Sequence, residues 1–162
     1  MRATLHIREA GEADAPGVAA VVRASFLEYR DSLDPPTQAW SESAESVGIR
    51  LASSTGFLAE ISGVTVGAVF ARAASGTFYF ERLAVHPSYR RQGVAAALIR
   101  NVEQRASDLR LSKVTLRARL AQPANIMLFE SLGYRIYARG DHPETGESTY
   151  ALLEKSIGEG TA

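Results

Sequence analysis

The sequence predicts one α/β domain, a central twisted mixed β-sheet of six to seven strands flanked by about four helices. Segments in which apolar residues alternate, as in strands, are interspersed with segments in which they recur every three or four positions, as in helices. Their order is strand, two helices, three strands, helix, strand, helix and two strands, which favours a mixed sheet with helices on its faces. The 162 residues are too few for a second domain, and 46% of them are apolar, enough for one core. We therefore expect residues 1–162 to form a single domain.

The N-terminal segment is predicted to form a strand followed by two helices. Alternation of apolar residues predicts a strand over Thr4–Arg8. A helical pattern begins near Glu12 and ends at Phe26, and its acidic first turn suits the positive end of the helix dipole. Asp34-Pro35-Pro36 then interrupts the chain, and a weaker helix follows over Ser41–Leu51.

The middle of the chain is predicted to form a meander of three strands. Turns at Ser62-Gly63 and Ser75-Gly76 separate three apolar segments of strand length. The three strands are Phe57–Ile61, Val64–Arg72 and Thr77–Val85.

The C-terminal part alternates helices and strands. The predicted elements are a helix over Val94–Ala106, a strand over Val114–Ala118, a short helix over Ala124–Leu132 and terminal strands at Tyr134–Ala138 and Thr149–Glu154. Gly133 ends the short helix. The strand, helix and strand that span residues 77–118 should form a parallel, right-handed crossover.

The composition argues against several function classes. Eighteen basic residues balance eighteen acidic ones, so no general affinity for nucleic acid or for an anionic membrane is expected. The absence of cysteine excludes a thiol nucleophile, a disulfide framework and a cysteine-ligated zinc, and His6 and His142 have no partners at metal-ligand spacing, so we expect no metal. With no leader-like N-terminus and no membrane-length apolar run, a cytoplasmic protein is expected.

The segment from Tyr89 to Ala96 has the features of an anion-binding turn. It leads from a polar loop into a helix, whose first turn exposes backbone N–H groups that have no partner within the helix. Gly93 lets an oxygen approach the backbone closely, and Arg90 and Arg91 add positive charge. A phosphate group is the ligand that this pattern favours. The alternative is an ordinary loop with solvated arginines.

Two stretches carry a resemblance to a known family. Leu83-Ala84-Val85-His86-Pro87-Ser88-Tyr89-Arg90-Arg91-Gln92-Gly93-Val94-Ala95 resembles the acyl-CoA signature, [QR]xxGx[GA], of the GNAT superfamily of N-acetyltransferases. Arg90, Gly93 and Ala95 fill its fixed positions. The segment Asn125–Tyr134, which ends in Leu-Gly-Tyr, is similar to the family's second CoA-contacting segment. The resemblance covers residues 77–134.

The resemblance implies acetyl-CoA as acyl donor and a set of residues that bind it. Backbone groups of Leu83 and Val85 would pair with the pantetheine arm, and amides from the turn at Gly93 would hold the pyrophosphate. Asn125 and Phe129 would flank the thioester end, although Asn125 could equally cap its own helix. The implied cofactor-binding residues are Leu83, Ala84, Val85, Arg90, Arg91, Gln92, Gly93, Val94, Ala95, Ala96, Asn125 and Phe129.

The chain departs from the family pattern at its catalytic positions. Many relatives have a tyrosine, a proton donor for the departing thiolate, where this chain has Phe129, and a phenyl ring donates no proton. Tyr134 or Tyr137 could take that role, although both fit a packing role better. The strand after the central helix also lacks the carboxylate of some relatives. Glu81 is the candidate base, with a solvated surface carboxylate as the alternative, and His86 is a weaker candidate.

The implied reaction is direct transfer of an acetyl group to a primary amine in a ternary complex, without a covalent enzyme intermediate. Alignment of the two substrates would supply most of the catalysis. Residues that could line the acceptor site, or equally pack in the core, are Phe26, Tyr29, Trp40, Tyr79, His142 and Tyr150. The acceptor could be a small molecule or a protein amine, and a homodimer is compatible with the family. The alternatives are a CoA-binding module with little or no activity, acting as a sensor or interaction partner, and a transferase for a larger acyl group, with Ala84, Met127 and Phe129 lining its thioester pocket.

Overall fold

The computed structural model describes residues 3–27, 39–141 and 144–158. Its strands form a single seven-stranded sheet in the order β1-β2-β3-β4-β5-β7-β6, which confirms the predicted mixed sheet. The strands are β1 (Leu5–Glu9), β2 (Thr55–Ile61), β3 (Val64–Ala74), β4 (Thr77–Val85), β5 (Lys113–Arg119), β6 (Arg135–Asp141) and β7 (Ser148–Ser156). The three-strand meander is present, as predicted, as antiparallel β2, β3 and β4.

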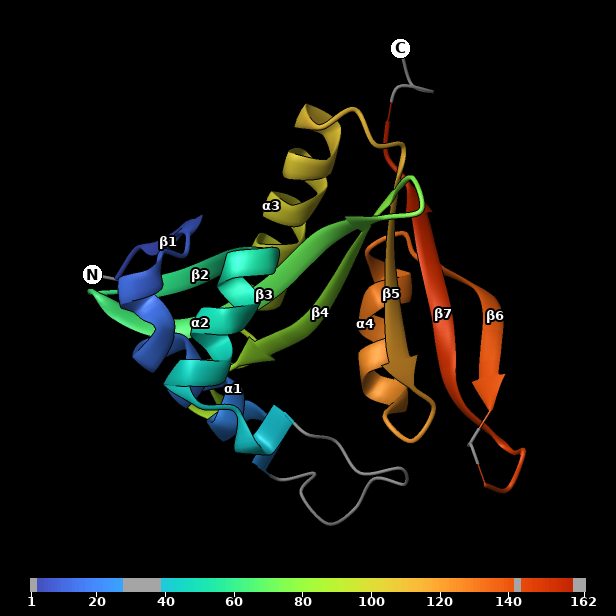
Figure 1. Ribbon diagram of the computed structural model, residues 1–162, viewed down its shortest axis with the longest axis horizontal. Coiled ribbons are helices and arrows are strands. Elements are labelled where there is room, and N and C mark those ends of the chain that lie inside the picture. The colour runs from blue at the N-terminus through green and yellow to red at the C-terminus, as the bar shows by residue number, and fades with distance from the viewer. Residues whose placement is uncertain (1–2, 28–38, 142–143, 159–162) are drawn as a thin grey trace.

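Within the described residues, four α-helices cover the two faces of the sheet. They are α1 (Ala15–Phe26), α2 (Ala44–Ser53), α3 (Val94–Asp108) and α4 (Pro123–Ser131). Apolar residues of α1 and α2 pack on one face against Leu58, Ala68 and Phe70, while α3 and α4 pack on the other face. Figure 1 shows α1 and α2 in front of β1–β4, and α4 beside β5. No helix in the described part of the chain is long and apolar enough to cross a membrane.

Two helices begin later than the sequence predicts, for reasons that lie in their first turns. Residues 12–14 form a short 3-10 turn, and α1 starts after it at Ala15, with Pro16 in its first turn, where the missing N–H costs no hydrogen bond. The second helix starts at Ala44 because Ser43 is its N-cap, and the Ser43 hydroxyl accepts a hydrogen bond from the Ser46 N–H at 3.1 Å.

The two halves of the sheet separate at its centre. Strand β4 pairs with β5 in parallel, as predicted for the crossover, but the pairing involves only Phe78–Phe80 and residues 114–116. Beyond those residues the strands diverge towards their C-terminal ends, as Figure 1 shows. The edge of β4 that faces β5 therefore has no strand partner from Glu81 onwards within the described residues. Unpaired backbone groups at such an edge can hydrogen-bond to an extended ligand.

A bulge in β4 reverses the side-chain alternation at the point of separation. Arg82 has a left-handed backbone conformation, with φ 56°. The register with β3 runs from Ala68 opposite Ala84 to Phe70 opposite Glu81, so two residues of β4 face one residue of β3. As a result Ala84 packs with the α1 and α2 core, whereas Leu83 and Val85 pack on the face of α3 and α4.

Candidate active site

Two cavities meet where β4 and β5 separate. The α3 cavity, about 460 Å³, extends from the start of α3 along β4 and includes Val85, Gly93 and Leu128 in its lining. The β7 cavity, about 570 Å³, extends across β5 towards β7 and includes Tyr79, Glu81 and Tyr150. The two cavities share five lining residues, Phe26, Leu83, Gln122, Asn125 and Phe129. Ligands bound in the two cavities would therefore contact some of the same residues.

The start of α3 is open to an anion. Gly93, the residue before the helix, has φ 81°, and a Cβ built there would meet nothing within 4 Å. No side chain caps this helix, and its first backbone hydrogen bond runs from the Ala97 N–H to the Gly93 carbonyl, 3.0 Å away. The N–H groups of Val94, Ala95 and Ala96 thus have no partner within the helix, and all three residues line the α3 cavity. This geometry suits a phosphate group.

The two arginines of the turn differ in their surroundings. The Arg90 guanidinium donates a hydrogen bond to the Ser25 carbonyl near the end of α1, at 3.2 Å, and so ties the turn to that helix. Arg91 is exposed and has a left-handed backbone, with φ 62°. Both line the α3 cavity. The ring Nδ1 of His86 accepts a hydrogen bond from the Ser88 N–H at 3.1 Å, which gives His86 a structural role in the same turn.

The shared wall holds a polar group that lacks a partner. The side-chain nitrogen Nε2 of Gln122 is buried and has no hydrogen-bond partner among the described residues. A buried amide without a partner costs free energy, so a ligand carbonyl within reach would be bound favourably. Beside it, the ring of Phe129 makes edge-to-face contacts with Phe80 and Tyr134, at centroid distances of 6.0 and 6.4 Å. The shared wall thus combines aromatic rings with the side-chain amides of Gln122 and Asn125.

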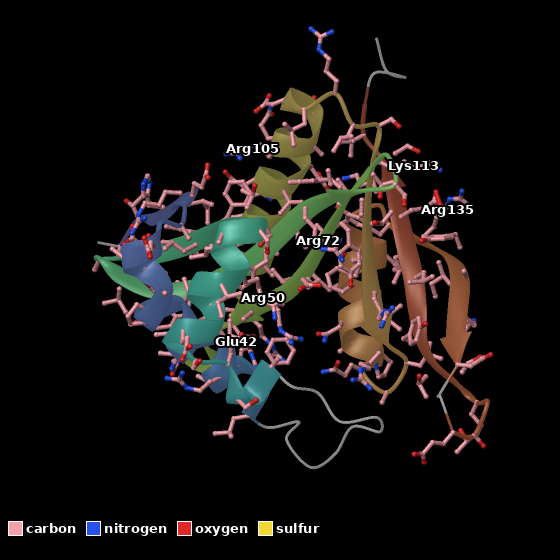
Figure 2. All side chains as sticks on the ribbon, viewed as in Figure 1. Glu42, Arg50, Arg72, Arg105, Lys113 and Arg135 are labelled. Carbon is pink, nitrogen blue, oxygen red and sulfur yellow. The ribbon has the colours of Figure 1, made fainter. Side chains whose placement is uncertain are left out.

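Glu81 lies on the β7 cavity within a network of alternating charges. Its carboxylate forms an ion pair with Arg50 of α2. Arg50 also lies 3.6 Å from a carboxylate oxygen of Glu42, which in turn accepts a hydrogen bond from Arg82 at 3.2 Å. The Glu42 side chain is only 4% exposed. Figure 2 shows Glu42 and Arg50 close together beside α2. The network connects α2 to the bulge of β4 next to the shared wall.

Aromatic rings and further arginines complete the β7 cavity. Burial, and then the charge of Glu81, raise the pKa of Tyr79 above its ordinary value, while Arg117, Arg72 and Arg82 oppose the shift. The Arg72 guanidinium lies 5.4 Å from the centre of the Tyr79 ring, and that of Arg117 lies 4.2 Å from the centre of the Tyr150 ring. The charged residues that line the β7 cavity are three arginines and two carboxylates, namely Arg82, Arg117, Arg119, Glu81 and Asp141.

The fold and the matched family agree with this arrangement. A model of the family described as "Acetyltransferase (GNAT) family" matches residues 21–134, which include β4, the turn at Gly93, α3 and α4. The chain belongs to the GNAT acetyltransferase family. The sequence resemblance to this family is thereby confirmed.

Solved structures share the GNAT fold over nearly the whole chain. The ribosomal-protein-S18-alanine N-acetyltransferase of Escherichia coli is 18% identical, with a TM-score of 0.75 and coverage of 96% of this chain and 97% of that one. PaiA N-acetyltransferase of Thermoplasma acidophilum in complex with coenzyme A is 12% identical, with a TM-score of 0.79 and coverage of 94% and 99%. A GNAT family acetyltransferase of Elizabethkingia anophelis with acetyl-CoA bound is 18% identical, with a TM-score of 0.71 and coverage of 94% and 98%. A comparison with curated proteins gave no match.

Most of the residues expected to bind the cofactor of this GNAT protein line one cavity. Ten of them border the α3 cavity, namely Leu83, Val85, Arg90, Arg91, Gly93, Val94, Ala95, Ala96, Asn125 and Phe129. The other two do not: Ala84 is buried in the α1 and α2 core, and Gln92 is exposed outside both linings. Met127, named for a larger acyl pocket, is 68% exposed and borders neither cavity.

Only some of the candidate catalytic and acceptor residues line a cavity. Glu81, Phe26, Tyr79 and Tyr150 line the β7 cavity together. Tyr134 lines neither cavity, because its buried hydroxyl points to Glu103, and Tyr137 is 47% exposed outside both. Tyr29, His142 and the Trp40 side chain lie outside the described residues.

Three residues of the site, Gln122, Arg50 and Arg117, were not predicted from the sequence. Gln122 follows a strand end and precedes Pro123 at the start of α4, which is a signal for a helix start but not for a contact with two cavities. The side chain of Asn125 makes no capping bond to α4 and lines both cavities.

Proposed function

We propose that this GNAT protein transfers an acetyl group from acetyl-CoA to a primary amine by direct attack in a ternary complex. The observation that carries the proposal is the shared wall of Phe26, Leu83, Gln122, Asn125 and Phe129, at which the α3 cavity and the β7 cavity meet. Acetyl-CoA would occupy the α3 cavity and the amine the β7 cavity. Holding the two reacting groups in contact supplies several kcal/mol of the barrier to acyl transfer.

The residues at the α3 cavity fit the chemical groups of acetyl-CoA. The free amides of Val94, Ala95 and Ala96, with Arg91 nearby, match a pyrophosphate. The unpaired edge of β4 at Leu83 and Val85 matches the amide-containing pantetheine arm. The partnerless Nε2 of Gln122 would donate to a carbonyl of that arm or of the thioester.

Glu81 is the proposed base for the amine. It borders the cavity proposed for the acceptor and stands one residue before the bulge. Its ion pair with Arg50 holds the carboxylate in place, and it would accept the proton that the amine loses as the new C–N bond forms and the C–S bond breaks. The departing thiolate would take its proton from solvent, since Phe129 carries no hydroxyl.

Titration calorimetry with acetyl-CoA tests the donor site. Gly93→Glu places bulk and negative charge where the phosphates would lie, so we expect wild type to bind and this variant to lose at least tenfold in affinity. Gly63→Glu is the matched control, because Gly63 also has a positive φ of 78° with nothing within 4 Å, in the turn between β2 and β3. Absence of binding to the folded wild type, or equal loss in both variants, would refute the donor site.

Thiol release during reaction with a panel of primary amines tests the transfer step. We expect Glu81→Gln to lower kcat by about 10²-fold or more without changing the affinity for acetyl-CoA, in line with the usual contribution of a general base. An inactive CoA-binding module would bind acetyl-CoA normally and release no thiol with any amine. A donor with a longer acyl chain that outcompeted acetyl-CoA would instead favour a different acyltransferase.

A further inference from the structure

One of the arginines that line the β7 cavity, Arg117, has no acidic partner among the described residues. Arg82 is paired with Glu42, and Arg50, which reaches Glu81 from α2, is paired with both carboxylates. Arg117 of β5 lines the cavity, and its guanidinium makes no ion pair or hydrogen bond with any described residue. The second carboxylate on this wall, Asp141, accepts a hydrogen bond from the Ser148 hydroxyl at 3.4 Å. Arg117 is thus a cation available to a ligand.

The guanidinium of Arg117 stacks on an aromatic ring. It lies over the ring of Tyr150, 4.2 Å from the ring centre. The ring itself packs directly on Gly140 of β6, where a Cβ would fall 1.7 Å from Cζ of Tyr150. Only glycine leaves room for this ring position. A guanidinium over an aromatic face keeps its N–H groups free at its edges, and these can bind a carboxylate with two parallel hydrogen bonds.

Arg117 and Glu81 stand at the same level of the sheet. Tyr79 of β4 pairs with Thr115 of β5, and Glu81 and Arg117 follow two residues later on their strands. Side chains two residues apart lie on the same face, so both side chains face the β7 cavity where the strands begin to separate. Paired strands lie about 4.8 Å apart, so the side chains of Glu81 and Arg117 are close enough for one small molecule to contact both.

We propose that the acceptor is a small amine that also carries a carboxylate, as an amino acid does, with its carboxylate bound by Arg117 and its amine directed at Glu81. The proposal rests on the proposed function and names the substrate class for the same site. A cavity of about 570 Å³ suits a small molecule. An acceptor without an anion would make no ion pair with Arg117, which is exposed at the edge of the cavity.

Matched acceptor pairs test the proposal. The measurement is kcat/KM at saturating acetyl-CoA for amino acids against the corresponding decarboxylated amines and amino acid amides. We expect the wild type to prefer the carboxylated member at least tenfold. Arg117→Gln should abolish that preference through KM for the acceptor, Arg117→Lys should keep part of it, and neither should change the KM for acetyl-CoA. Gly140→Ala should reduce the preference as well, because it displaces Tyr150.

The control variant is Arg139→Gln, which removes an exposed arginine of the neighbouring strand β6 outside both cavities and should leave the preference intact. A preference for uncarboxylated amines would overturn the proposal, as would a preference for carboxylates that survives Arg117→Gln. Loss of acetyl-CoA binding in titration would instead overturn the proposed function. Normal acetyl-CoA binding with no acetylation of any carboxylated amine would reject the substrate class alone.

Discussion

The hydroxyl of Tyr134 donates a hydrogen bond to Oε2 of Glu103, 2.7 Å away. The same carboxylate accepts from the Lys155 ammonium at 3.1 Å, so Glu103 of α3 binds both β7 and Tyr134, the residue before β6. Burial, and then the hydrogen bond to Glu103, raise the pKa of Tyr134 far above its ordinary value. A phenol in these surroundings is a structural donor, away from both cavities.

Tyr134→Phe should therefore cost stability rather than activity. We expect about 1.5 kcal/mol of unfolding free energy to be lost near neutral pH, since the hydrogen bond is to a charged acceptor, and a change in kcat of less than about threefold. Chemical denaturation and the thiol-release assay measure the two effects. A hundredfold loss of kcat in the folded variant would instead make Tyr134 the proton donor.

The stability difference between wild type and Tyr134→Phe should become smaller as the pH rises above about 10. Because the pKa of Tyr134 is raised in the folded state, the unfolded chain loses the phenolic proton first as pH rises past about 10. The advantage of wild type over Tyr134→Phe should thus be complete below that pH and shrink above it, by at most about 1.4 kcal/mol per pH unit. Denaturation curves at pH 9 and 11 check this, and a difference that grew with pH would contradict it.

Gly67→Ala should weaken both the fold and acetyl-CoA binding. A Cβ at Gly67 of β3 would lie 2.8 Å from Cγ1 of Val94 and 3.1 Å from the carbonyl oxygen of Ala84. The start of α3 would have to move away from the sheet, which should cost about 1–3 kcal/mol of stability and lower the affinity for acetyl-CoA several-fold in calorimetry. Unchanged affinity with reduced stability would show that the turn at Gly93 moves independently of β3.

Gly48→Ala is expected to have the opposite effect. Gly48 lies inside α2, and a Cβ there would meet nothing within 4 Å. Because alanine favours the helix and restricts the unfolded chain, the unfolding free energy should rise by about 0.5–1 kcal/mol. Thermal unfolding measures it, and the variant also shows that adding a methyl group to a glycine is not harmful by itself. A destabilised Gly48→Ala would mean that α2 packs more tightly than described.

Glu42→Gln should destabilise the protein and reduce acetyl transfer. Its carboxylate is 4% exposed and is the shared partner of Arg50 and Arg82. Removing the charge leaves two arginines without their buried partner, at a cost of about 3 kcal/mol, and loosens Arg50 beside Glu81. Denaturation and kcat should both change, with the affinity for acetyl-CoA preserved. Glu45→Gln, at an exposed position in the first turn of α2, serves as the control and should change neither stability nor kcat.

Phe129→Tyr should raise the rate of transfer. The ring borders both cavities, so an added hydroxyl would reach the wall at which the thiolate departs. A donated proton stabilises that leaving group, and we expect kcat to increase about tenfold. Steady-state kinetics with a good acceptor check the effect, and Phe129→Leu, which removes the ring, should lower kcat. A slower Phe129→Tyr would indicate that the contacts with Phe80 and Tyr134 do not tolerate the hydroxyl.

The sequence predicted those parts of the fold and site that depend on short-range chemistry. The bounds of β4 are those expected for Thr77–Val85, because a Gly turn and a His-Pro step mark its ends. The turn at Gly93 was predictable for the same reason, since a helix start and its glycine are neighbours in the chain. The ten expected residues around the α3 cavity come almost entirely from two such continuous segments.

Contacts between distant segments were beyond prediction from the sequence. Arg50 meets Glu81, thirty-one residues further along the chain, because α2 packs on β3 next to β4. Gln122 lies in the turn between β5 and α4, where its side-chain nitrogen has no hydrogen-bond partner among the described residues. Arg117 lies over Tyr150 because β7 lies between β5 and β6 in the sheet. The left-handed Arg82 has no glycine to signal it, so its bulge could not be expected either.

The bulge at Arg82 makes the site sensitive to the number of residues in β4 rather than only to their identity. One extra residue allows a single strand to present Glu81 to the β7 cavity, Val85 to the α3 cavity and Leu83 to the wall that they share. Deleting one residue there would exchange the two faces downstream, turning Ala84 out of its core and the apolar side chains away from α3. Side chains in this strand can therefore be exchanged during evolution, while insertions and deletions at this point would separate the donor from the acceptor.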